Sequence, residues 1–131
     1  MKLLSIVLIF LSIILALFLT GNLLSFIDGF SFMVVFLPVV GSIPARHGLE
    51  GFKSLLKEGD ERKGVLHSMG ATSIISGFLG THIGVVIMLS NLGDPNVLGP
   101  SMAVSLLPIF YGLLIFLLTT VLSHLNLGKE L

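Results

Sequence analysis

Four long stretches of the chain contain no Asp, Glu, Lys or Arg, and apolar side chains dominate each of them. A helix that crosses the hydrocarbon layer of a membrane needs roughly 20 apolar residues, with a range of about 17 to 25. Once Gly, Asn and Pro at the ends are trimmed, the stretches predict spanning helices over residues 3–20, 29–45, 66–91 and 100–124. The pattern therefore indicates an all-α integral membrane protein, with four transmembrane helices forming one domain over residues 1–131.

Composition and charge narrow the possible functions. Apolar residues make up 54% of the chain and charged residues only 11%, against about 25% charged in soluble domains. The formal net charge is +0, so no basic excess is present to neutralise nucleic-acid phosphates. The chain has no cysteine, which excludes disulfides and thiolate metal sites. A soluble domain and a nucleic-acid partner are both excluded.

The cations indicate how the chain is oriented. All of them fall in the terminal segments or between the second and third predicted helices: Lys2, Arg46, Lys53, Lys57, Arg62, Lys63 and Lys129. Lys and Arg accumulate on the cytoplasmic side of membrane proteins. We therefore expect a multi-pass protein of the cytoplasmic (inner) membrane, with both termini and the loop 46–65 in the cytoplasm. The apolar run after Lys2 also has features of a signal peptide, but it is longer than the about 7 to 15 residues typical of one.

The loop 46–65 carries its own helical pattern. Leu49, Phe52, Leu55 and Leu56 share one helical face, and Gly59 ends the pattern. This predicts a short amphipathic helix at the membrane surface or against a neighbouring subunit, or a docking site for another protein. The mixed-charge run 60–63 that follows is expected to be solvated.

Enzyme chemistry is not indicated. The four His residues lack metal-ligand spacing, and no Ser is arranged with His and Asp in a recognisable catalytic order. We expect no catalytic residue, metal or cofactor. No Asp or Glu lies inside a predicted span, so the chain by itself offers no buried carboxylate of the kind that proton-driven machines use.

The third span carries small and polar residues at helical spacing. Gly77, Gly80 and Gly84 form a stripe that lets another helix approach closely, and Thr81 places a hydroxyl near mid-membrane beside it. The stripe is interpreted as a helix-packing seam or, with Thr81, as the wall of an ion path. His82 lies about 100° further round the helix on an apolar face. It is interpreted as a neutral imidazole bonded to a neighbouring helix or as a participant in proton movement.

One segment resembles a known family. Residues 77–112 read GFLGTHIGVVIMLSNLGDPNVLGPSMAVSLLPIFYG. The Gly-Thr pair, the exit loop MLSNLGDP, the entry LGPSMAVSLL and the Tyr111-Gly112 pair resemble flagellar stator subunits of the MotA/TolQ/ExbB proton channel family. A weaker similarity covers residues 26–28 and Ser31, at the start of the family's second span. The similarity is to a short form, in which residues 46–65 stand where flagellar stators carry a large cytoplasmic domain.

The resemblance implies an assembly. Members form a homopentamer around two copies of a single-span partner, of the MotB/ExbD kind, whose intramembrane Asp titrates. The third and fourth spans line the central channel, and ions pass between subunit and partner. By this resemblance, Thr81 belongs to the ion path, with Tyr111 and His82 as further candidates.

Departures from the family pattern modify this expectation. Pro108 and Ile109 stand where relatives have two adjacent Thr, Ile74 replaces a Pro, and Leu122 replaces another. Because Pro108 cannot donate a hydrogen bond to the Val104 carbonyl, we expect a kink in the fourth helix. Fewer hydroxyls remain to replace the hydration shell of sodium, so the expected ion is the proton.

The sequence thus predicts a subunit of a proton-driven membrane motor complex, of the stator type. The alternative is a non-conducting pentameric scaffold that binds a partner or membrane lipid in its central cavity.

Overall fold

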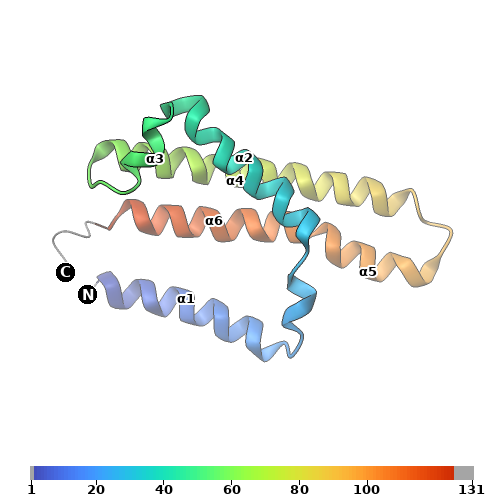
Figure 1. Cartoon of the computed structure of the whole chain (residues 1–131). Coiled ribbons are helices and arrows are strands. Elements are labelled where there is room, and N and C mark those ends of the chain that lie inside the picture. The colour runs from blue at the N-terminus through green and yellow to red at the C-terminus, as the bar shows by residue number, and fades with distance from the viewer. Residues whose placement is uncertain (1, 126–131) are drawn as a thin grey trace.

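A computed structural model describes residues 2–125, with side chains from Leu4 onward. All regular secondary structure in this range is helical. The chain runs through α1 (Lys2–Leu19), the short 3-10 helix η1 (Leu23–Phe26), α2 (Gly29–His47), α3 (Glu50–Ser54), α4 (Asp60–Leu89), α5 (Pro95–Ser105) and α6 (Leu107–Ser123) (Figure 1). The all-α class is confirmed.

Three helical segments are long and apolar enough to cross a membrane: Leu23–His47, Asp60–Leu89 and Pro95–Ser123. The apolar part of α1, Leu4–Leu19, is shorter. The protein is therefore a multi-pass membrane protein with three long apolar helices and one shorter one.

Local chemistry sets the helix ends. The Asp28 carboxylate accepts a hydrogen bond from the Ser31 amide at 2.7 Å and caps α2, and Asp94 caps α5 in the same way through Asn96 at 3.0 Å. Gly48 ends α2 with a φ of 65°, and Gly59 precedes α4 with a φ of 149°. Both values lie in the region that glycine adopts without steric cost, so these glycines separate the helices at the α2–α4 connection.

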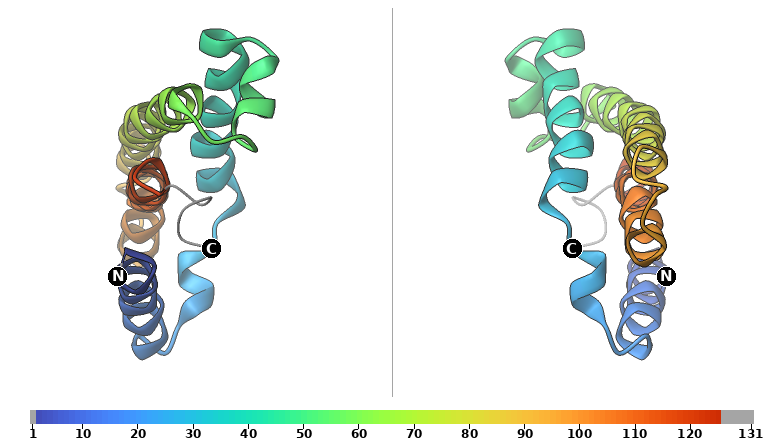
Figure 2. Two further views of the ribbon diagram at one scale, coloured as in Figure 1. Left: turned by 90° about the vertical axis from the view of Figure 1, so that its left-hand side faces the viewer. Right: turned by 90° about the vertical axis from the view of Figure 1, so that its right-hand side faces the viewer.

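The helices form a layer with one helix across it. Figure 2 shows α4, α6 and α1 stacked in one layer, with α2 and α3 on one side of it. Helices α4 and α6 run antiparallel along each other, and α2 packs across α4 (Figure 1). The core lies where α2 meets this pair, around Val35, Val39 and Ile43 of α2 and Val65 of α4.

The N-terminal end of α1, the α2–α4 connection and the C-terminal end of α6 lie at the same end of the molecule (Figure 1). The connections after α1 and after α4 lie away from that end. Hence the segments that carry the cations gather together, although Lys129 and the side chain of Lys2 lie outside the described part.

Two sequence expectations need correction. The charged run 60–63 forms the first turn of α4, and its side chains are exposed as expected except that of Arg62, which is only 8% exposed. Its guanidinium donates to the Leu125 carbonyl at 3.3 Å, which explains how the charged group is accommodated. The amphipathic helix of the loop is reduced to α3, with Leu49 and Leu56 largely exposed outside it.

Candidate functional site

Small residues bring α4 and α6 unusually close together. A Cβ atom added to Gly77 would lie 2.8 Å from the Pro108 carbonyl oxygen, and one added to Gly84 would lie 2.7 Å from the Cα of Ser105. Gly80 is confined between the Pro108 ring, at 2.7 Å, and the Val34 side chain, at 2.9 Å. These positions have no room for a side chain, so the glycine stripe faces the α5–α6 boundary.

Ser73 and Gly112 continue this contact toward the middle of α6. The Ser73 hydroxyl is fully buried and lies 2.7 Å from the Gly70 carbonyl and 3.0 Å from the Gly112 carbonyl. A Cβ at Gly112 would collide with the backbone carbonyl of Ser73. The sequence pattern alone assigned Ser73 no role. Its position three and four residues from Gly70 and Gly77 is the signal that places it on the seam.

Thr81 occupies the point where the fourth apolar segment is interrupted. Helix α5 ends at Ser105 and α6 begins at Leu107, immediately before Pro108, whose ring crowds the preceding turn. The Ile109 amide donates to the Thr81 hydroxyl oxygen at 3.1 Å. In an uninterrupted helix that amide would bond to the carbonyl four residues earlier. The Thr81 side chain thus satisfies a backbone donor that the break releases.

His82 lies apart from this contact. Its side chain is exposed, its Nδ1 lies 2.8 Å from the Phe78 carbonyl, and its ring centroid is 4.3 Å from that of Phe78. The surrounding exposed side chains on α4 include Ile75 and Val86, so His82 points to the outer apolar surface of the single chain. The contact with its own helix gives this ring nitrogen a polar partner.

Tyr111 lies at a third place, where α6 meets the start of α2. Its hydroxyl accepts a hydrogen bond from the Asp28 amide at 3.0 Å and donates one to the Phe26 carbonyl. It therefore ties α6 to the connection between η1 and α2. The structure brings together Thr81, Pro108 and the glycine stripe, whereas Tyr111 and His82 each have separate partners.

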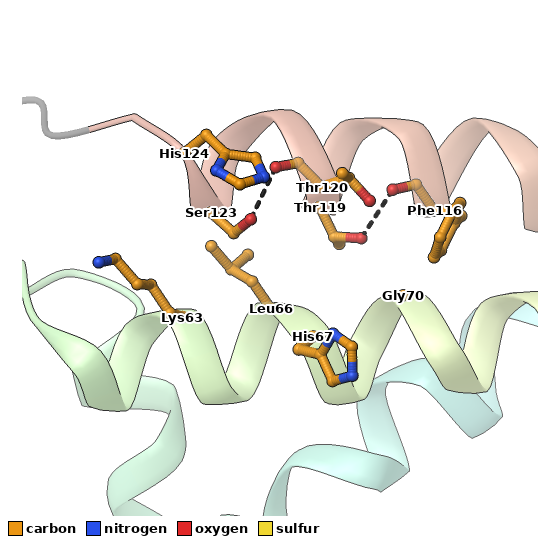
Figure 3. A pocket seen from close by; sticks show the side chains of 9 residues that line it. All are labelled: Lys63, Leu66, His67, Gly70, Phe116, Thr119, Thr120, Ser123 and His124. Carbon is orange, nitrogen blue, oxygen red and sulfur yellow. Dashed lines mark hydrogen bonds between the residues drawn. The ribbon is translucent and has the colours of Figure 1, made fainter.

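A groove opens between α4 and α6 toward the end where the cations gather. Its volume is about 550 Å³, and Figure 3 shows the side chains that line it: Lys63, Leu66, His67, Gly70, Phe116, Thr119, Thr120, Ser123 and His124. Sequence reasoning did not find this groove, because its two sides lie more than 40 residues apart. Within residues 2–125, no three His, Asp or Glu side chains cluster closely enough to hold a metal ion.

Comparison with known proteins now identifies the family. The model of the MotA/TolQ/ExbB proton channel family matches residues 50–129, which include α4, the α5–α6 pair and the seam between them. The chain belongs to this family. This is a family of channel proteins and not of enzymes.

Several known proteins are similar to part of the chain. The chemotaxis protein PomA of Vibrio alginolyticus is 47% identical over 49 residues, which are 37% of this chain and 19% of PomA. The uncharacterized protein YtxD of Bacillus subtilis is 46% identical over 56 residues, 41% of this chain and 21% of YtxD. Motility protein A of Cereibacter sphaeroides is 55% identical over 38 residues, 29% and 15% of the two chains. The match thus spans about a fifth or less of each relative.

Proposed function

We propose that this chain is a subunit of a proton-driven membrane motor complex, assembled as a homopentamer around a dimeric single-span partner. The observation that carries the proposal is the family match over α4–α6, where the glycine seam holds two helices together with Thr81 at their contact. Two relatives bear names that refer to motility and chemotaxis.

The partner in this proposal supplies the titrating acid. From Gly64 to Gly93 and from Pro95 to Gly128 the chain contains no Asp or Glu, so its own spans hold no carboxylate. A proton moving through the membrane needs an acceptor at depth. An intramembrane Asp on a MotB/ExbD-like helix would meet this need, and Thr81, with its remaining hydroxyl proton, would lie on the route to it. His82 and Tyr111 are secondary ion-path candidates.

The proposed topology has four spans, with both termini and residues 46–65 in the cytoplasm. The one-sided placement of the cations supports it. Under this topology α1 also crosses the bilayer, and α4 together with α5–α6 lines the central channel.

The test is ion flux in liposomes that contain the chain and its co-expressed single-span partner. A pH-sensitive dye should report proton uptake that Thr81→Val abolishes, Thr81→Ser retains and His82→Phe alters only modestly. Native mass spectrometry of the same preparation should give five copies to two. Sodium-dependent flux, or proton uptake indifferent to Thr81→Val, would contradict the proposed ion route.

A non-conducting scaffold is the second candidate. One observation favours it: the oxygen of Thr81 already accepts the Ile109 amide, and Pro108 and Ile109 offer no hydroxyl beside it. A stable pentamer that shows no flux with the partner present would select this alternative.

A further inference from the structure

The groove between α4 and α6 carries basic groups that neither the seam nor the proposed ion route uses. Lys63 and His67 line it from α4, and His124 lines it from the end of α6 (Figure 3). The described residues that line this groove include no carboxylate. Lys63 lies 3.6 Å from the fully exposed Asp60 carboxylate, and such a solvated pair is weak. The groove thus favours an anionic occupant.

The position of the groove relative to the hydrocarbon layer indicates which kind of anion it meets. Helix α4 has 30 residues and a length of about 45 Å, which exceeds the roughly 30 Å of the hydrocarbon layer. All α4 residues that line the groove lie between Lys63 and Gly70, within the first eleven residues of the helix. If the apolar remainder of α4 spans the hydrocarbon, these residues lie at the level of the lipid headgroups on the cation-rich side.

We propose that this groove binds the headgroup of an anionic phospholipid of the cytoplasmic leaflet. The proposal rests on the orientation proposed above but not on ion conduction. Lys63 supplies a charged donor, and the imidazoles of His67 and His124 supply ring N–H donors. Basic pockets between transmembrane helices on this side of a membrane are a recognised form of lipid recognition.

The hydroxyl groups and the apolar side chains of the groove match the remaining parts of such a lipid. Ser123 donates its hydroxyl proton to the Thr120 carbonyl at 2.7 Å, so its oxygen remains an acceptor for a hydroxyl of a glycerol headgroup. Leu66 and Phe116 provide apolar surface beside the polar groups. A lipid with an anionic phosphate, a glycerol headgroup and an acyl chain matches all three features.

The experiment measures lipid retention by the purified protein in detergent, using phosphatidylglycerol and phosphatidylcholine as probes. Native mass spectrometry should show phosphatidylglycerol retained at least about tenfold more than phosphatidylcholine. The triple variant Lys63→Gln, His67→Gln, His124→Gln should lose about tenfold of this preference, because each basic group near a headgroup contributes a several-fold effect. The control variant Lys53→Gln, Lys57→Gln removes two cations outside the groove and should keep the preference.

A second variant tests the site without changing charge. Thr120→Phe places a large side chain at an exposed position in the groove and should also reduce retention. Equal retention of both lipids by the unmodified protein would overturn the proposal, as would equal losses in the groove and control variants. A disulfide between two protomers that each carry Thr120→Cys, with no lipid preference, would assign the groove to a second copy instead.

Discussion

The hydroxyl of Thr81 has a measurable structural role in the single chain. Replacing it in Thr81→Val leaves the Ile109 amide without its acceptor at a half-buried site. An unsatisfied donor of this kind costs about 1–3 kcal/mol. Denaturant unfolding in mixed micelles, followed by circular dichroism, should show that loss. Thr81→Ser keeps the hydroxyl and is the control. Equal stability of the two variants would contradict the assigned hydrogen bond.

Tyr111 is expected to hold the start of α2 in place. Tyr111→Phe removes the hydroxyl that bonds to Asp28 and Phe26 but keeps the ring, whose centroid lies 6.0 Å from that of Phe32. We therefore expect a loss of about 1–2 kcal/mol in local stability, seen as faster hydrogen exchange at the Asp28 amide. Exchange at α4 amides near Gly77 should not change. Unchanged exchange at Asp28 would mean that the connection is held by other contacts.

At single positions, the sequence indicates which residue types are unusual but not what they contact. Thr81 and Tyr111 stand out because polar groups are costly within a membrane. Their partners lie 28, 83 and 85 residues away along the chain, and helical periodicity carries no information over such separations. His82 is different, because its hydrogen bond runs to Phe78 within one helical turn.

At the scale of helices, the close packing of α4 against α6 can be tested at Gly112. Gly112→Ala places a methyl group against the backbone carbonyl of Ser73, where neither helix can yield without moving. Overpacking of this kind costs about 1–3 kcal/mol. Gly41 is also within a helix but has open space around it, so Gly41→Ala should be neutral or gain up to about 1 kcal/mol. Thermal unfolding of both variants in the same detergent provides the comparison.

The helices themselves follow closely from the hydrophobic pattern, whereas their ends depend on capping and on contacts. Asp60 and Glu61 lie in the first turn of α4, where their negative charges interact favourably with the positive end of the helix dipole. The helix therefore begins before the apolar run from which it was predicted. The fourth apolar segment begins at Pro95, because Asp94 caps it, and it divides at Leu106. Hydropathy does not detect either feature. The small-residue stripe indicated that another helix packs closely against α4, but the identity of that helix and its register, with Pro108 and Gly112 at the contact, require three-dimensional packing.

The surface of the whole chain is apolar on several sides. Large exposed apolar side chains occur along α1, α2 and α4, among them Phe18, Phe36 and Phe78. Soluble monomers rarely expose extended apolar patches, and such faces mark contact with lipid or with other proteins. The groove between α4 and α6 lies at one end of this surface, whereas buried serines such as Ser73 and Ser76 lie inside the molecule. This distribution agrees with a chain that crosses a bilayer and has faces available for neighbouring subunits.

The orientation of the chain can be tested directly because it contains no cysteine. Asn96 follows the connection between α4 and α5, and Lys57 lies between α3 and α4, at opposite ends of the molecule (Figure 1). Both positions are exposed, so Asn96→Cys and Lys57→Cys should not disturb packing. Segments rich in Lys and Arg stay on the cytoplasmic side of the membrane, so we expect Lys57 inside and Asn96 outside. A membrane-impermeant maleimide applied to intact spheroplasts should therefore label Asn96→Cys and leave Lys57→Cys unlabelled until the membrane is opened. Labelling of Lys57→Cys from outside would reverse the orientation, and with it the assignment of the groove to the cytoplasmic leaflet. Labelling of both positions from the same side would show instead that α4 does not cross the membrane.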